Sequence, residues 1–396
     1  MTTVAKFGGS VLSDGTYWQK ILKIISQDEN RRIAVVSAIG RRFFGDAKVT
    51  DLLISFFNAA EDKKNTIWQD VALRYKNIAC FFNIDAESLI NETYDSMRGK
   101  DFSFCVSRGE YLSAKLFSLI SGMQYLEAAR LIKFDVNKNL LTDLTEQLIF
   151  DAVKQGTFVM GGFYGSDTNG NIVLFDRGGS DITGALLASA VNAEVYENWT
   201  DVNGFFVCDP RVVLNPRKID CLSFEQLKIL STLGAGVLHA QSVYPVQKKQ
   251  ITVDIKSIFK PHLSGTLIVP NAPAAQKILG ITGRQVKKLF VTQHKTNAHA
   301  DNALYCCQNC GFCTLLLKET EKEKYFCDGI LQKREAGLIS IAHSGVKEIA
   351  EKTCFALSKQ EIKHQLLCND GGLLLIEINA NTVNNAIKTI YSHFFE

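Results

Sequence analysis

The sequence contains no long hydrophobic run. A helix that crosses a membrane needs about 18 or more consecutive apolar residues, and no stretch of the 396 residues approaches that length. The first residues also lack the apolar core of a secretion signal. The hydrophobic content of 46% is divided among short segments instead, and it is ample for buried cores. We therefore expect a soluble, cytoplasmic protein of roughly two to three domains, with no membrane partner.

The chain also lacks an excess of charge of either sign. It has 44 Lys and Arg residues against 41 Asp and Glu residues, a formal net charge of +3, and no long basic run. A nucleic-acid-binding protein needs a concentrated positive surface for the phosphates, so we expect no nucleic-acid partner. The 11 cysteines mostly occur singly within apolar runs, which is typical of buried thiols in a reducing compartment.

Two common nucleotide-binding patterns are absent as well. The chain opens with the apolar run Val4–Phe7, then Gly8-Gly9-Ser10, then a helical pattern over Thr16–Ile25. Because Lys6 precedes the glycines, this segment is neither a P-loop nor a Gly-x-Gly-x-x-Gly dinucleotide motif. A lysine at the end of a strand beside two glycines can still hold phosphates, since backbone N–H groups assist its point charge.

A second glycine loop is the most informative feature present. It spans Phe175–Thr183 and contains Arg177-Gly178-Gly179-Ser180-Asp181 ahead of an apolar helical run. The two glycines allow a ligand close to the backbone, and the planar guanidinium of Arg177 suits a carboxylate or phosphate. Ser180 and Asp181 stand where the next helix would begin, as caps or as ligand contacts.

Short apolar runs alternate with helical patterns up to about residue 270. Strands are predicted over 33–37, 157–161, 194–199 and 251–255, and helices over 51–60 and 182–191. This alternation favours a mostly parallel sheet covered by helices. The segment Pro270–Pro273 reads as a linker. Beyond it we predict strands over 338–341 and 373–378, and helices over 346–358 and 382–392.

Further motifs accompany the two glycine loops along the chain. They are Val35–Ala38, Lys48–Leu53, Ser107–Ala114, Gly162–Gly165, Trp199–Gly204, Asp209–Arg211, Gly234–His239 and Ser264–Ile268. Together with Lys6–Val11 and Arg177–Asp181, this series resembles the aspartokinases of the amino-acid kinase family. The resemblance covers residues 1–270 well and the remainder loosely.

The resemblance implies an α/β amino-acid kinase fold, with a mostly parallel central sheet between helices, as the catalytic domain over 1–270. Two small α+β ACT-like domains would follow over 279–336 and 337–396. The first of these departs from the family because it lacks the usual Gly-Phe-Leu run after its first strand. Because ACT modules commonly pair between chains, the resemblance implies a homodimer or larger assembly through these domains. Because the first module is degenerate, we expect weak or absent inhibition by lysine and threonine.

The activity that the resemblance implies is transfer of the γ-phosphoryl of ATP to the side-chain carboxylate of L-aspartate. The product is 4-phospho-L-aspartate, the first intermediate toward lysine, threonine and methionine. A free carboxylate with a pKa of about 3.9 is already ionised at neutral pH, so no general base is needed. The site must instead bring two anions together and neutralise their charge. Mg²⁺ is implied as a companion of ATP, without an assigned protein ligand.

The resemblance also implies roles for individual residues. The predicted catalytic residues are Lys6, which stabilises the transferring phosphoryl, and Asp181, which organises the lysine and the metal-bound phosphates. The predicted aspartate-binding residues are Ser37, Thr50, Glu110, Arg177 and Ser180, with Arg177 on the α-carboxylate and Glu110 on the α-ammonium. The predicted nucleotide-binding residues are Lys6, Gly8, Gly9, Ser10, Thr200, Asp201, Phe206, Asp209 and Arg211.

Two features of the sequence leave alternative interpretations open. Gly236 stands where many aspartokinases have a lysine that faces the nucleotide, and Lys248 or Lys249 is a candidate substitute. The cluster Cys306–Cys313 has spacings like those of an iron–sulfur site, but no Cys-Pro follows, and a cysteine-rich strand and turn is the simpler interpretation. The rival functions are another amino-acid kinase, such as glutamate 5-kinase, and a weakly active amino-acid sensor that acts through its ACT-like modules.

Overall fold

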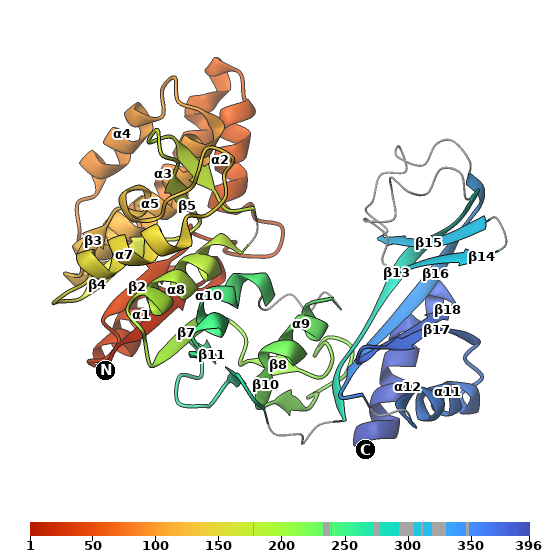
Figure 1. Cartoon of the computed structure of the whole chain (residues 1–396). Coiled ribbons are helices and arrows are strands. Elements are labelled where there is room, and N and C mark those ends of the chain that lie inside the picture. Colours follow the sequence, from red (N-terminus) through yellow and green to blue (C-terminus); the bar gives the residue numbers. More distant parts are fainter. Residues whose placement is uncertain are drawn as a thin grey trace. The chain divides into compact units, whose positions relative to one another are not determined.

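The structure is a computed structural model that describes residues 1–176, 178–232, 238, 240–272, 277–292, 305–309, 312–318, 330–345 and 348–396. It consists of two compact units. The first unit contains Met1–Phe205, Asp220–Lys228 and Gly236–Ala272, and the second contains Phe206–Ile219, Ile229–Ala235 and Pro273–Glu396. Figure 1 shows the elements of both units.

The first unit is built on an eight-stranded sheet with the order β10-β12-β11-β7-β1-β2-β4-β3. Neighbouring strands from β11 through β3 are parallel, whereas β12 runs antiparallel to β11. The strands are β1 (Thr3–Phe7), β2 (Ile33–Val36), β3 (Gln124–Leu126), β4 (Phe158–Gly161), β7 (Val195–Thr200), β10 (Cys221–Ser223), β11 (Thr252–Ser257) and β12 (Thr266–Val269). The chain also has two short strand pairs, β5 (Tyr164–Ser166) with β6 (Ile172–Leu174) in the first unit, and β8 (Phe205–Phe206) with β9 (Lys218–Ile219), of which β9 belongs to the second unit.

Helices cover both faces of this sheet. On one face, α1, α5 and the helices between them in the sequence pack against Phe7, Val36 and Trp199 of the sheet. Their buried side chains form a hydrophobic core. On the other face, α8 packs against β1, β2 and β7. The helices of this part of the chain are α1 (Gly15–Ser26), α2 (Val49–Asn58), α3 (Glu61–Phe81), α4 (Glu87–Ser96), α5 (Phe102–Ser121), α6 (Ala128–Leu131), α7 (Thr142–Ala152), α8 (Gly179–Ala190), α9 (Phe224–Thr232) and α10 (Tyr244–Lys248).

The second unit contains a six-stranded sheet with the order β14-β15-β13-β16-β18-β17, in which all neighbours are antiparallel. The strands are β13 (Ile278–Thr292), β14 (Tyr305–Asn309), β15 (Phe312–Lys318), β16 (Ile330–His343), β17 (His364–Asp370) and β18 (Leu373–Ile378). The helices are α11 (Glu348–Lys359) and α12 (Val383–Phe395). Val383 of α12 sits close against Gly283 and Gly337, where a Cβ on either glycine would lie 2.7 Å from it.

The elements predicted from the sequence are confirmed, and apart from the strand predicted at 338–341 their bounds shift by up to three residues. The mostly parallel sheet with helices on both faces agrees with the predicted fold class. In the second unit, the predicted strand at 338–341 is the end of the much longer β16, and β17 was not predicted. The predicted boundary between residues 336 and 337 falls inside β16, which pairs with both β13 and β18. The division into two ACT-like domains stays a prediction.

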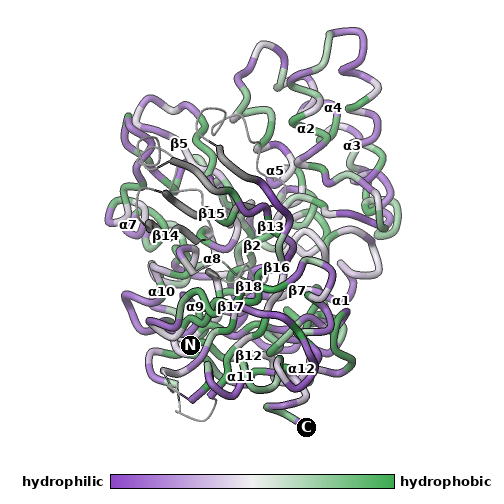
Figure 2. The backbone as a smooth tube through the Cα atoms, turned by 90° about the vertical axis from the view of Figure 1, so that its right-hand side faces the viewer, coloured by the Kyte–Doolittle hydropathy of each residue, from purple (hydrophilic) through white to green (hydrophobic). Residues whose placement is uncertain are grey.

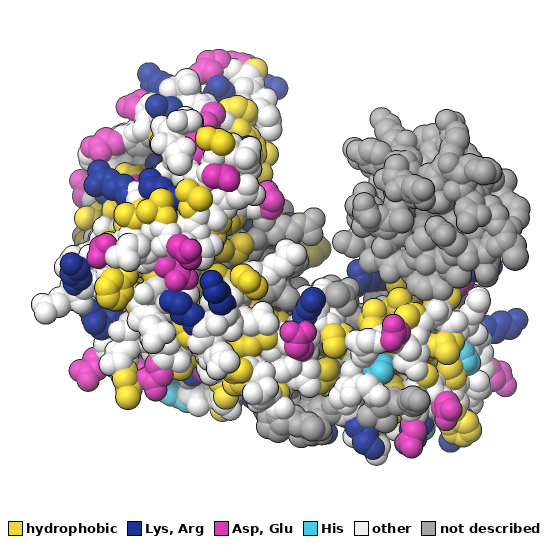
Figure 3. Space-filling view, viewed as in Figure 1, with side chains coloured by type: hydrophobic (Ala, Val, Ile, Leu, Met, Phe, Trp, Pro, Cys, Tyr) yellow, Lys and Arg dark blue, Asp and Glu magenta, His cyan; other side chains and the backbone are white. Residues whose placement is uncertain are grey.

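Hydrophobic residues alternate with polar ones in short segments along the backbone (Figure 2). No helix among the described residues is long and apolar enough to cross a membrane. Acidic and basic side chains are interspersed on the visible surface of the first unit (Figure 3). Gly236, His239 and Cys310 lie outside the described residues, and of Cys306, Cys307 and Cys313 only the strand positions in β14 and β15 are described.

Candidate active site

A cavity of about 770 Å³ lies in the first unit, at the carboxyl ends of β1, β2 and β7. This volume is within the usual range for small-molecule sites. Eleven residues that the sequence predicts as functional line it: Lys6, Gly8, Gly9, Ser10, Ser37, Thr50, Glu110, Ser180, Asp181, Thr200 and Asp201. The structure therefore brings together motifs that are up to about 190 residues apart in the sequence, because parallel strands end at the same edge of a sheet.

Lys6 and Asp181 form an ion pair in this cavity. Lys6 lies next to the end of β1, and Asp181 is in the first turn of α8. Lys6 Nζ is 2.5 Å from Asp181 Oδ1, and the two side chains are 10% and 16% exposed. Asn198 of β7 joins the pair, since its Nδ2 donates to Asp181 Oδ1 at 2.8 Å and its Oδ1 accepts from Lys6 Nζ at 3.4 Å.

The turn after β1 is shaped by glycines that meet other backbone closely. Gly40 N donates to Gly9 O at 2.8 Å, and Gly8 N donates to Trp199 O at 3.1 Å. A Cβ on Gly9 would lie 2.7 Å from Ala38 O, closer than any real Cβ contact. The glycines are therefore required by packing, and they leave the backbone of the turn exposed to a ligand in the cavity.

The second glycine loop places the start of α8 at the cavity. Gly178 has a φ of +61°, a left-handed conformation that favours glycine. Gly178, Gly179, Ser180 and Asp181 line the cavity, so the positive end of the helix dipole faces it. Arg177, which the sequence predicts as the ligand of the α-carboxylate, lies outside the described residues.

Glu110 of α5 is buried, with an exposed fraction of 5%. Its Oε2 has no hydrogen-bond partner among the described residues. Burial raises the pKa of Glu110 to about 8, although backbone N–H groups, including that of Ala38, partly oppose this shift. A buried carboxylate that lacks a cation is unfavourable by itself, so this side of the cavity is suited to a positively charged ligand group.

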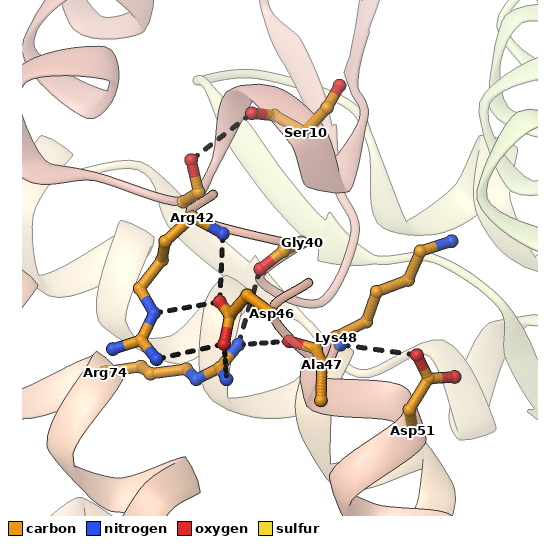
Figure 4. A network of polar contacts seen from close by, with 9 residues as sticks. Ser10, Gly40, Arg42, Asp46, Ala47, Lys48, Asp51 and Arg74 are labelled. Carbon is orange, nitrogen blue, oxygen red and sulfur yellow. Dashed lines mark hydrogen bonds and ion pairs between the residues drawn. The ribbon is translucent and has the colours of Figure 1, made fainter. Parts of the chain in front are cut away.

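A polar network holds the loop between β2 and α2 (Figure 4). Asp46 Oδ1 accepts from the guanidinium groups of Arg42 and Arg74, each at 3.0 Å. Arg74 comes from α3 and also donates to the carbonyl oxygens of Ala47 at 2.7 Å and Gly40 at 3.4 Å. The network thus ties both ends of the loop to one buried arginine and leaves Lys48 with its side chain directed away from Asp46.

Three predicted nucleotide-binding residues lie in the second unit. They are Phe206, Asp209 and Arg211, and the role predicted for them stays a prediction. Arg211 is exposed and forms an ion pair with Asp209 at 2.6 Å. Neither Lys248 nor Lys249, the candidate substitutes for the lysine that relatives have at Gly236, lines the cavity. The Lys249 ammonium binds Glu146 at 3.1 Å and Ser189 O at 2.8 Å, near the opposite end of α8 from Asp181. The role of either lysine stays a prediction.

The cavity also contains residues to which the sequence analysis assigned no role. Those with polar or aromatic side chains are Ser13, Tyr17, Arg41, Arg42, Lys48, Phe163 and Phe259. Phe163 has a φ of +77°, which is uncommon for a residue with a side chain. Asn198 is also a new candidate, although its position just before the Trp199-Thr200-Asp201 motif was a usable signal.

Comparison with known proteins agrees with this architecture. Residues 1–257 match the amino acid kinase family. Aspartokinase 3 of Bacillus subtilis and the lysine-sensitive aspartokinase 3 of Escherichia coli are each 30% identical over 67% of this chain, and the matched part spans 63% of each relative.

Two solved structures match the whole chain. The aspartate kinase of Clostridium acetobutylicum has a TM-score of 0.84 and 27% identity over 99% of both chains. E. coli aspartokinase III, solved in complex with aspartate and ADP, has a TM-score of 0.82 and 20% identity over 100% of both chains, and it supports the fold. The resemblance to aspartokinases is confirmed by these similarities, and the chain belongs to the amino acid kinase family.

Proposed function

We propose that this protein is an aspartate kinase, which transfers the γ-phosphoryl group of ATP to the side-chain carboxylate of L-aspartate. One observation carries the proposal. A single cavity contains a lysine–aspartate pair at a glycine turn and, separately, the buried carboxyl group of Glu110, whose Oε2 has no hydrogen-bond partner among the described residues. The first feature suits a phosphoryl group and the second suits the ammonium of an amino acid. The aspartate and ADP bound in the E. coli relative agree with this pairing.

The chemistry requires charge neutralisation rather than a base. The aspartate carboxylate is ionised at neutral pH, so it can attack the γ-phosphorus directly. The negative charge that spreads over the transferring group needs donors in fixed positions. Lys6 is the proposed principal donor, supported by the backbone N–H groups of Gly9 and Ser10. Gly8, whose own N–H donates to Trp199 O, contributes to the turn that lines the cavity. The amino end of α8 adds a favourable dipole.

The proposed amino-acid subsite is centred on Glu110. When the α-ammonium of aspartate approaches, Glu110 gains the cation that its Oε2 lacks. The ligand should therefore lower the pKa of Glu110 and release the proton that the empty site holds. Ser37, Thr50 and Ser180 would contribute hydroxyl groups from the same cavity. Arg177 is the proposed partner of the α-carboxylate.

The proposed nucleotide subsite adds Thr200 and Asp201 of the cavity, together with Phe206, Asp209 and Arg211 of the second unit. Mg²⁺ would arrive with ATP. Among the described residues, no three His, Cys, Asp or Glu side chains converge as the ligands of a protein metal site would. A magnesium ion that accompanies ATP takes its ligands mainly from phosphate oxygens and water.

The experiment that tests the function is an ADP-release assay with purified protein, ATP, Mg²⁺ and a panel of amino acids. We expect turnover with L-aspartate and little with L-glutamate, L-lysine or no amino acid. Preference for glutamate would indicate another amino-acid kinase. Binding of amino acids without turnover would instead favour a sensor protein.

Assembly and regulation are a separate part of the proposal. We propose a homodimer or larger assembly formed through the second unit, with weak or absent inhibition by lysine and threonine. The degenerate sequence over 279–336 supports weak inhibition, because a poor binding site has little differential affinity with which to shift a conformational balance. Light scattering of the full chain and titration of each amino acid into the assay test the two parts. A monomer, or strong inhibition at submillimolar lysine, would contradict the corresponding part.

A further inference from the structure

Strand β7 holds Asp181 at two points. The hydroxyl of Tyr196 donates to the main-chain oxygen of Asp181 at 3.0 Å, and Asn198 Nδ2 donates to its carboxylate at 2.8 Å. Tyr196 and Asn198 are two residues apart on one strand, so their side chains point to the same face of the sheet, against α8. A strand and the first turn of a helix are thereby joined beside the cavity.

The side-chain amide of Asn198 also contacts Lys6. Lys6 and Asn198 are directly paired in the register of β1 and β7, which are parallel neighbours, so their side chains leave the sheet on the same face. Asn198 Oδ1 accepts from Lys6 Nζ at 3.4 Å. Asn198 is 3% exposed and therefore makes these contacts away from water.

An amide satisfies both neighbours at this position. Asparagine has a carbonyl oxygen that accepts and an amino group that donates, so it can meet an ammonium and a carboxylate at once. An aspartate there would repel Asp181, and an apolar side chain would leave both charged groups with one partner fewer in a buried place. The ammonium has three N–H donors. Asp181 and Asn198 engage two of them, which leaves one for a ligand in the cavity that Lys6 lines.

We infer that Asn198 is a positioning residue, which holds the Lys6 ammonium and the Asp181 carboxylate in the arrangement that phosphoryl transfer uses. The inference rests on the proposed function and adds a residue to it. Without the amide, the ammonium is free to turn toward Asp181, because that carboxylate is then its one remaining partner among the described contacts. The third donor then no longer points where the transferring phosphoryl group lies.

The first variant is Asn198→Ala. We expect kcat to fall by roughly 10- to 100-fold, the range that follows the loss of hydrogen bonds to charged groups. ATP affinity should weaken several-fold, while the KM for aspartate stays within about twofold because Glu110 is untouched. The matched control is Ser189→Ala, which removes another buried polar contact of α8, to Glu146, far from the pair. It should keep wild-type kcat.

The second variant, Asn198→Asp, tests the pH dependence of kcat, which a purely structural role of Asn198 would not change. A carboxylate beside Asp181 raises the pKa of one of the two groups, so that a shared proton can replace the amide donor at low pH. We expect the kcat of this variant, relative to wild type, to decline as pH rises from about 6 to 9. A flat ratio across that range would overturn the inference.

Binding measurements separate this inference from the proposed function. Calorimetry with ATP and Mg²⁺ alone should show the weakened affinity of Asn198→Ala even if no amino acid is phosphorylated. Wild-type protein that binds ATP but phosphorylates no amino acid contradicts the proposed function only. Wild-type kcat and wild-type ATP affinity in a folded Asn198→Ala protein contradict the role of Asn198. If this variant does not fold, Asn198→Ser replaces it in the same measurements.

Discussion

Gly9 and Gly40 meet backbone to backbone, and neither has room for a side chain. Gly40 N donates to Gly9 O at 2.8 Å, and a Cβ on Gly40 would lie 2.5 Å from that same oxygen. The turn after β1 and the loop after β2 are therefore fixed to each other at the cavity. Because the first carries the proposed phosphate donors and the second carries Arg42 and Lys48, the contact joins two parts of one site.

Replacing Gly40 with alanine tests this contact. The new methyl group must push the turn at Gly9 away, and we expect ATP affinity to fall by at least about tenfold, a loss of roughly 1.4 kcal/mol of binding free energy. Gly45→Ala is the control from the same loop. It has open space for a Cβ but a φ of +88°, so it should cost about 1–2 kcal/mol of stability and leave ATP affinity unchanged. Equal ATP affinity in both variants would contradict the prediction.

Lys6→Met should abolish most turnover while the protein remains folded. The loss of a principal donor to the transferring group costs roughly 10²–10³ in rate, or about 2.7–4 kcal/mol. Lys249→Met is the matched control, because it also removes an ion-paired lysine next to α8 but one that binds Glu146. The ADP-release assay should show near wild-type kcat for the control. Comparable losses in both variants would argue against a special role of Lys6.

Glu110→Gln should stabilise the empty protein and remove its use of aspartate. Burial raises the pKa of Glu110 to about 8 from its usual value of 4.5, so the folded state binds this proton more tightly than the unfolded state. Stability therefore falls as pH rises from 4.5 to 8, and glutamine escapes this loss because it does not ionise.

Calorimetric unfolding at pH values below, within and above that range measures the effect. We expect the melting temperature of Glu110→Gln to exceed that of the wild type by an amount that grows with pH. A constant or negative difference would show that Glu110 is not a destabilising carboxylate in the empty protein.

Asp46→Ala should be strongly destabilising. The Asp46 and Arg74 side chains are 7% and 3% exposed, and removing one partner of a buried pair costs about 3–5 kcal/mol because the other charge is left uncompensated. Asp95→Ala is the control. It breaks an ion pair with Arg98 whose side chains are 63% and 73% exposed, a kind of pair that contributes about 0–1 kcal/mol. Urea denaturation of both variants checks the difference, and similar midpoints would contradict it.

The sequence by itself determined the local elements and the residue types of the site. Alternating apolar runs and helical patterns depend on spacings of two and about 3.6 residues, which are visible without a structure. Glycine pairs beside Lys6 and before Ser180 likewise indicate turns near a ligand through their own conformational properties. These signals, together with the motif series that resembles the aspartokinases, named eleven of the residues that line the cavity.

Only the tertiary structure decided which distant residues meet. Asn198 contacts Lys6 across 192 positions, and Arg74 reaches Gly40 from a helix that begins at Glu61. No local pattern marks such contacts, because they arise when parallel strands and their covering helices pack in three dimensions. The same reason explains β16, whose continuity across residues 336 and 337 follows from pairing with β13 and β18 on its two sides rather than from its own sequence.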